Sequence, residues 1–176
     1  MRQARCMKVI RSVLVAAKAT SPMRIVHFCV QRDHLHLIIE ADEREAFLSG
    51  IRGLTIQLSK RLNAALLLSG RLWADRYQAE ELNSFSQLRQ ALVFVLNNRL
   101  WHSSRRGGQT KPAKTIDPCS SGLTFDGWRG IKAKALTLEP AVEEPRGFAL
   151  RRGWRRHGLI AIDELPGGSF AEPPEG

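Results

Sequence analysis

Two histidines separated by one residue are the part of this sequence best suited to chemistry. His34 and His36 lie in the stretch RIVHFCVQRDHLHLIIEA (residues 24–41), where two apolar runs flank a polar break at residues 31–33. This pattern predicts two strands joined by a short turn. Side chains alternate along a strand, so the two imidazoles share a face and could bind one divalent metal ion. A His-x-His pair also occurs as ordinary polar surface, so the spacing alone leaves both interpretations open.

The segments around these strands have helical periodicity. Apolar residues recur three and four apart in residues 4–19 and again from about Glu43 to Leu68, which predicts two amphipathic helices. A weaker strand pattern follows at residues 73–82. Ser84 and Gln87 then have the spacing of a capping box, which predicts a helix that runs to about His102. Together these elements indicate an α+β fold.

The charge of the chain favours a polyanionic partner. The formal net charge is +10, with seven Arg or Lys residues and no acidic residue in residues 1–32 and four arginines within residues 151–156. Nucleic acid is the first candidate and an anionic membrane surface the second, while a merely soluble basic surface remains an alternative. No apolar run is long enough to span a membrane. Three dispersed cysteines fit a reducing compartment, so we expect a cytoplasmic protein.

The composition changes after His102. Residues 103–122 are rich in Gly, Ser, Pro and Lys and predict a mobile basic linker. Scattered aromatic residues follow, with a short helix expected around residues 149–158 and disorder at residues 167–176. We therefore expect one folded domain at residues 1–102 and an irregular basic linker and tail, partly disordered, at residues 103–176.

Four sequence blocks, in this order and spacing, resemble the REP-associated tyrosine transposases of bacteria, within the single-tyrosine His-hydrophobic-His transposases. They are VQRDHLHLIIEA at 30–41, GLTIQLSKRLN at 53–63, GRLWADRYQAEEL at 70–82 and ALVFVLNN at 91–98. The resemblance covers about residues 5–102. It implies a small antiparallel sheet with packed helices in βαββαβ order, a ferredoxin- or RRM-like arrangement. Because the chain begins at the first helix, we expect the family's opening strand to be missing, as in a truncated copy, and one sheet edge to be exposed.

The resemblance also implies a mechanism. In the family, two histidines bind Mg²⁺ or Mn²⁺, a tyrosine attacks a phosphate of single-stranded DNA, and a polar residue four positions later completes the metal site. His34 and His36 match the metal pair and Asn98 matches the third ligand. The nucleophile's position holds Phe94, which has no oxygen. The chain's one tyrosine, Tyr77, suits a structural or DNA-stacking role better than that of a substitute nucleophile.

Three functions follow as hypotheses. The first is a transposase-derived protein of a mobile element, monomeric or homodimeric and nucleoid-associated, that binds hairpin-bearing single-stranded DNA and a metal but cuts poorly or not at all. The second is an active enzyme, either through Tyr77 or as an unrelated hydrolase with a His-x-His metal site. The third is a non-catalytic basic nucleic-acid-binding module. For DNA contacts we expect Arg52, Lys60, Arg61, Arg76 and Tyr77.

Overall fold

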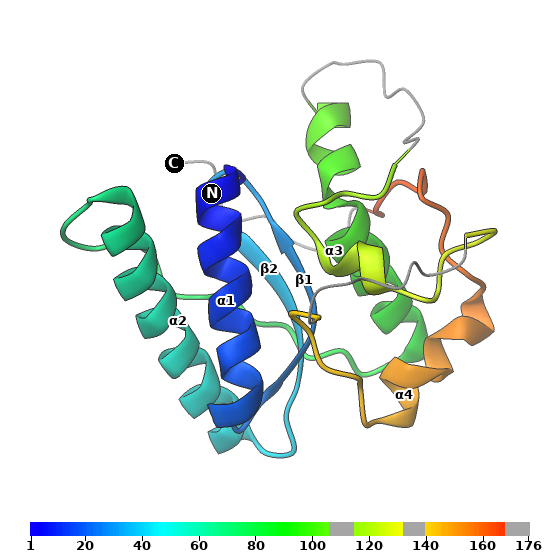
Figure 1. Cartoon of the computed structure of the whole chain (residues 1–176). Helices are drawn as coiled ribbons and strands as arrows, with labels where there is room; N and C mark the ends of the chain where they lie inside the picture. The colour runs from blue at the N-terminus through cyan, green and yellow to red at the C-terminus, as the bar shows by residue number, and fades with distance from the viewer. Residues whose placement is uncertain (106–114, 132–139, 168–176) are drawn as a thin grey trace.

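The computed structural model describes residues 1–105, 115–131 and 140–167 and has a mixed α+β architecture, as expected (Figure 1). Its elements, in chain order, are α1 (Ala4–Thr20), β1 (Arg24–Val30), β2 (Leu35–Glu40), α2 (Arg44–Leu66), α3 (Phe85–Arg105), the 3-10 turn η1 (Ser121–Thr124), α4 (Phe148–Arg151) and the 3-10 turn η2 (Gly153–His157). The predicted helices and two of the three predicted strands in the first 105 residues are confirmed to within a few residues.

Local signals in the sequence explain where the helices begin and end. The chain leaves α1 at Ser21, just before Pro22, because the residue before a proline avoids helical geometry. The backbone N–H of Gln87 donates to the Ser84 hydroxyl over 3.1 Å, and the Gln87 side chain accepts from the N–H of Asn83 over 3.0 Å. This reciprocal capping fixes the start of α3 and so the register of every side chain that α3 carries.

The two strands form an antiparallel sheet that lies between two helical layers (Figure 1). Cys29 of β1 is opposite His36 of β2, with a bulge between Ile25 and His27. Leu35, Leu37 and Ile39 pack toward the core that β1 shares with α1 and α2. Ile38, on the other face, belongs to the core built on α3. The alternation predicted for β2 is therefore confirmed, and it turns the histidine face toward α3.

The prediction of a third strand at residues 73–82 is wrong. Residues 68–83 form an irregular connection from α2 to α3, and within the described residues their backbone makes no hydrogen bond to either strand. The segment is held by side chains instead. Trp73 Nε1 donates to the Thr55 carbonyl over 3.2 Å, and the Tyr77 ring packs edge-on against Phe47. A strand needs a partner along its backbone, so the sheet has two strands rather than those of the βαββαβ order.

Segments from the second half of the chain close one edge of this sheet. Val30 N–H donates to the Cys119 carbonyl over 2.8 Å, and Glu143 N–H donates to the Ile25 carbonyl over 2.9 Å. The Ser121 hydroxyl accepts from Phe28 N–H over 3.1 Å. The outer edge of β1 is thus paired. Among the described residues, the outer edge of β2 has no backbone partner, so β2 carries the exposed edge expected from the sequence.

The same segments add a second apolar core next to α3. Trp154, Trp128 and Phe125 are buried there, and Trp154 is only 1% exposed. The short helix expected around residues 149–158 is present as α4 and η2. Of the predicted linker, residues 115–122 are described and packed on β1, while residues 106–114 lie outside the described residues. Disorder was expected at residues 167–176, of which residues 168–176 lie outside the described residues.

Candidate metal and DNA-cleavage site

The imidazoles of His34 and His36 face each other at the start of β2. His34 Nε2 lies 3.0 Å from His36 Nε2, and the ring centroids are 4.7 Å apart at an interplanar angle of 79°. Two nitrogens that bind one ion at right angles, each about 2.1 Å from it, are themselves about 3.0 Å apart. Both residues are half-buried, so the pair has the spacing and the exposure of a two-histidine metal site.

Asp33 orients the first of these rings. Its Oδ1 lies 2.8 Å from His34 Nδ1, so the ring donates to the carboxylate. With the proton held on Nδ1, the lone pair of Nε2 points toward His36. A carboxylate behind a histidine is a common way of fixing the tautomer of a metal ligand. The turn before β2 therefore supplies an orienting group as well as a reversal of the chain.

Helix α3 brings the next two candidate residues to this face of the sheet. The Phe94 ring lies edge-on against the His36 imidazole, with centroids 4.9 Å apart. Asn98 is four residues further along α3, one turn beyond Phe94 and on the same side of the helix. The structure thus brings together His34, His36 and Phe94, and places Asn98 one turn away.

The Asn98 side chain is buried without the partners that a buried amide needs. The residue is 0% exposed, and among the described residues neither Nδ2 nor Oδ1 has a hydrogen-bond partner. Leaving such a group unpaired costs about 1–3 kcal/mol. Asn98 lies on the helix that packs against the histidine pair, and its unpaired Oδ1 is the kind of oxygen that binds a metal ion. In the described part of the chain, no three His, Cys, Asp or Glu side chains cluster in a way that could hold a metal ion, so any site here uses other donors.

Comparison with known proteins identifies the family. The family model described as "Transposase IS200 like" matches residues 1–97, more than half of the chain. The chain belongs to the IS200-like transposase family. No curated protein and no solved structure matches it. The match covers α1, both strands, α2 and the part of α3 that carries Phe94.

In this IS200-like chain the histidine pair opens onto a groove of about 3620 Å³. The groove is bounded by β2, one side of α2, the connection at residues 70–83 and one face of α3. His34, His36 and Phe94 line it, whereas Asn98 does not. Small-molecule sites usually measure about 300–1,000 Å³. The groove is therefore large enough for a polymer, in keeping with a family that acts on DNA.

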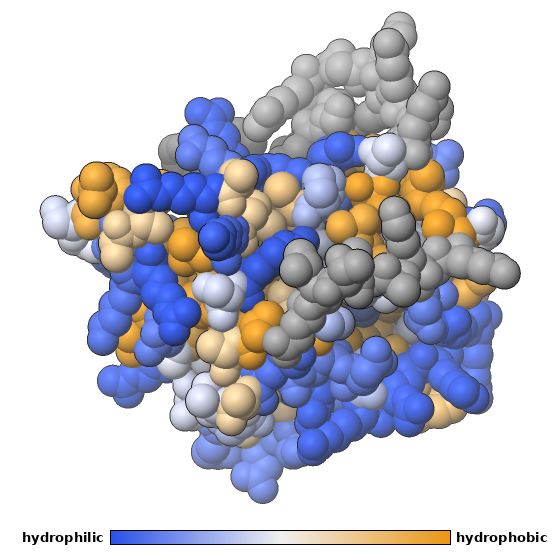
Figure 2. Space-filling model, in the orientation of Figure 1, coloured by the Kyte–Doolittle hydropathy of each residue, from blue (hydrophilic) through white to orange (hydrophobic). Residues whose placement is uncertain are grey.

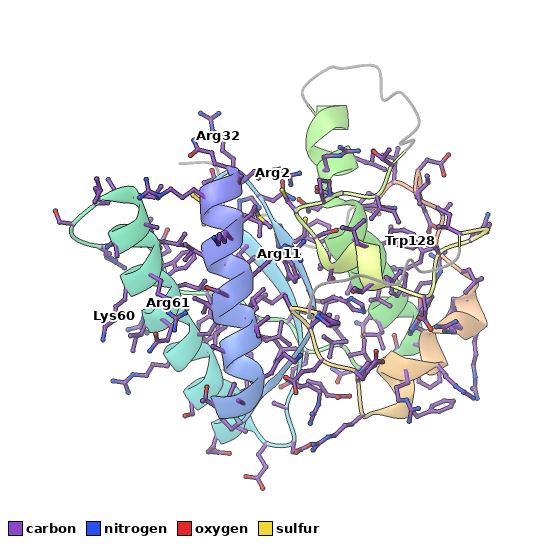
Figure 3. The ribbon with its side chains drawn as sticks, viewed as in Figure 1. Arg2, Arg11, Arg32, Lys60, Arg61 and Trp128 are labelled. Carbon is purple, nitrogen blue, oxygen red and sulfur yellow. The ribbon has the colours of Figure 1, made fainter. Side chains whose placement is uncertain are left out.

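The residues expected to contact DNA divide into two groups. Arg52, Arg76 and Tyr77 line the groove with the histidines. Lys60 and Arg61 are exposed but do not line it; they come from α2, on the opposite side of the molecule from α4 (Figures 1 and 3). Tyr77 is 46% exposed, so its phenol is accessible from the groove. Lys60 and Arg61 thus lie outside the groove that the histidine pair lines.

Among the described side chains, His27, Cys29 and His157 do not line the groove with the histidine pair. Burial lowers the pKa of His27 to about 4, and its Nδ1 lies 3.1 Å from the Ser121 hydroxyl. Burial raises the pKa of Cys29 to about 12, so its thiol stays protonated. His157 is exposed on η2. The side chain of His102 lies outside the described residues.

The groove is also lined by arginines that were not among the residues expected to contact DNA, namely Arg2, Arg32, Arg44, Arg71 and Arg99. Arg99 directly follows Asn98 on α3. It lies four residues after Val95, which also lines the groove, so the helical period places both on one side of α3. Arg2 is not a surface charge, because its guanidinium pairs with the buried Asp117 over 2.6 Å (Figure 3). Among the described residues no helix is long and apolar enough to cross a membrane.

Proposed function

We propose that this chain is a transposase-derived protein that binds hairpin-bearing single-stranded DNA and one divalent cation, Mg²⁺ or Mn²⁺, but cleaves DNA poorly or not at all. The observation that carries this proposal is the contact between Phe94 and His36, with ring centroids 4.9 Å apart. In the family a tyrosine stands at this position as the nucleophile. A phenyl ring beside the histidine pair has no oxygen that could attack phosphorus.

The donors present suit the proposed cation. Two imidazole nitrogens 3.0 Å apart and an unpaired buried amide offer a mixed nitrogen and oxygen site. His34 and His36 would hold the ion from the groove side and Asn98 from α3. When bound, the metal supplies positive charge that stabilises a phosphate approaching the site. Arg52, Arg76 and Arg99 line the same groove and would each contact a phosphate of the DNA backbone.

An active enzyme that uses Tyr77 is the second candidate. It is favoured by one observation, namely that the exposed Tyr77 lines the same groove as His34 and His36. Against it stands the position of Tyr77 on the irregular connection between α2 and α3, where the ring packs against Phe47. A nucleophile needs a fixed approach to the phosphate, which a helix provides better than a loop.

The test combines cation binding with DNA binding and a search for a covalent product. We expect isothermal titration with Mn²⁺ to show one site in the unmodified chain, lost in His34→Ala/His36→Ala and kept in His157→Ala, the matched exposed histidine. Hairpin DNA should shift on a native gel without forming an adduct stable to denaturation. An adduct with the unmodified chain would refute the loss of cleavage, and its disappearance in Tyr77→Phe would identify Tyr77 as the nucleophile. Unchanged Mn²⁺ binding in the double variant would refute the metal site.

A further inference from the structure

The segment around α4 and η2 is an exposed basic surface outside the candidate site. Residues 145–158 contain five arginines and no acidic residue. Four of the arginines are exposed, as is His157 at the end of η2. Figure 2 shows hydrophilic side chains over this part of the molecule, at the lower right, where Figure 1 has α4. The exposed arginines are Arg146, Arg151, Arg152 and Arg156.

Neighbouring acids do not neutralise this surface, because most of them are already paired. Asp126 accepts from Arg155 over 2.6 Å, and Glu164 pairs with Arg89 over 2.6 Å. Glu40 and Glu143 both pair with Arg24. The nearest acid in sequence is Glu144, which is exposed. The α4–η2 surface therefore keeps an excess of positive charge.

An exposed aromatic ring lies among these arginines. Phe148, the first residue of α4, is 58% exposed. Its ring packs edge-on against Phe85, and the Arg156 guanidinium lies over both rings, 5.8 Å from the centroid of Phe148 and 5.2 Å from that of Phe85. An exposed aromatic ring next to a stacked guanidinium is an arrangement with which proteins stack unpaired bases.

The core holds this surface in place. Both carboxylate oxygens of Glu40, at the end of β2, accept backbone N–H groups, from Arg146 and from Gly147, each over 2.7 Å. A Cβ on Gly153 would come within 2.5 Å of the Phe85 ring, so η2 packs directly on α3. Because its backbone is fixed at both ends, the α4–η2 surface needs little ordering to bind a ligand.

The surface also continues the groove. Ala149 and Leu150 of α4 line the groove that contains His34 and His36. Along β2, Glu40 is four residues from His36, a distance of about 14 Å at 3.4 Å per residue. That is about four nucleotides of a stacked strand, also at 3.4 Å each. A single strand with a phosphate at the histidine pair would therefore reach α4 within a few nucleotides.

We propose that the α4–η2 surface is a second DNA-binding site, in which Arg146, Arg151 and Arg152 contact phosphates while Phe148, backed by Arg156, stacks on an unpaired base. The site would hold the single-stranded flank of a hairpin that lies in the groove. This inference rests on the proposed function, since it assigns the surface to the same DNA.

Fluorescence anisotropy with a labelled DNA hairpin tests the proposal, with and without single-stranded flanks. Arg151→Ala/Arg152→Ala should bind the flanked hairpin about tenfold more weakly and lower the salt slope by about 1.4, the value for two lost single-strand phosphate contacts. Phe148→Ala should lower the affinity for the flanked hairpin by about 5- to 100-fold and leave the affinity for the hairpin alone almost unchanged. Phe148→Trp should restore binding, because an indole also stacks.

A matched control separates a local contact from the loss of charge alone. Arg5→Ala/Lys8→Ala removes two exposed charges from α1, and its affinity for the flanked hairpin should stay within about twofold of that of the unmodified chain. Circular dichroism and a thermal melt check that each variant is folded. If the α4–η2 variants match this control while the unmodified chain binds, the second site is refuted and the proposed function stands. If the unmodified chain binds no hairpin DNA at all, the proposed function itself is refuted.

Discussion

Phe94 and His36 are in edge-on contact, with ring centroids 4.9 Å apart. The contact joins α3 to the start of β2 and places a side chain without a reactive atom beside the histidine pair. Under the proposed function this is the position of the nucleophilic tyrosine, which differs from phenylalanine by a single oxygen atom. The scaffold around the site can therefore be tested directly.

The first prediction concerns Phe94→Tyr. The added hydroxyl should allow attack on DNA and give a 5′-phosphotyrosine adduct with Mn²⁺ present, detected on a denaturing gel with DNA labelled at its 3′ end. The cost to stability should be no more than about 1–3 kcal/mol, the cost of burying one unpaired hydroxyl. Phe94→Leu, which also lacks an oxygen, should give no adduct. A folded Phe94→Tyr variant that binds DNA and Mn²⁺ yet forms no adduct would contradict the proposed site.

The second prediction uses the unpaired amide of Asn98. Replacing it in Asn98→Leu removes a buried polar group without a partner, so the free energy of unfolding should rise by roughly 1–3 kcal/mol. Affinity for Mn²⁺ should fall by roughly tenfold or more, the scale of losses for groups that support a metal site. Urea unfolding and Mn²⁺ titration measure the two effects.

The neighbouring asparagine gives the control for that experiment. Asn97 Nδ2 donates to the carbonyls of Ala161 and Glu164, each over 2.9 Å. Asn97→Leu should therefore destabilise the fold by about 1–3 kcal/mol and leave Mn²⁺ affinity unchanged. If both substitutions destabilise the fold alike and neither changes Mn²⁺ affinity, Asn98 is a structural residue.

The third prediction is a pH dependence that originates at His27. Burial lowers its pKa from 6.5 to about 4 in the folded state, so below pH 6.5 the unfolded chain binds more protons than the folded one. The stability from the neutral ring is complete above pH 6.5 and is lost as the pH falls toward 4, by roughly 2–3 kcal/mol. His27→Gln, which can keep a hydrogen bond to Ser121, should remove this part of the acid sensitivity. Urea unfolding at pH 7 and pH 4.5 gives the difference, and equal losses in both proteins would assign the acid sensitivity to other groups.

The fourth prediction concerns the ion pair between Arg2 and Asp117. The guanidinium donates to both carboxylate oxygens, over 2.6 and 3.0 Å, and to the Val30 carbonyl over 2.7 Å. Arg2→Ala leaves the buried carboxylate uncompensated and should cost roughly 2–4 kcal/mol in urea unfolding. Arg32→Ala, an exposed arginine near the same end of the sheet, should cost less than about 0.5 kcal/mol (Figure 3). Equal effects of the two substitutions would mean that the pair does not hold the C-terminal segments in place.

The first half of the fold could be predicted from sequence because its signals are local and periodic. The apolar stripe of α1, the alternation in β2 and the capping residues Ser84 and Gln87 each determine an element from its own residues. The strand expected around Trp73 and Tyr77 was wrong for the opposite reason. A strand depends on a backbone partner elsewhere in the chain, and no local pattern records whether one is present.

The candidate site could be predicted only in part. The spacing of His34 and His36 and the family resemblance that singled out Phe94 indicated three residues that the structure brings together. The orienting contact of Asp33 and the position of Arg99 in the groove depend on three-dimensional packing. The aromatic core around Trp154 was also missed, because its members come from irregular segments without periodicity.

The hydrogen bonds from Val30 to Cys119 and from Ile25 to Glu143 have a practical consequence. A shortened version that stops where the family match ends, at residue 97, would uncover the β1 backbone and strip the aromatic cluster from α3. Such a fragment would expose strand edges on both sides of a two-stranded ribbon, a form prone to self-association. A version of this chain made for expression therefore needs the residues beyond the family match, because they pair with β1 and cover α3.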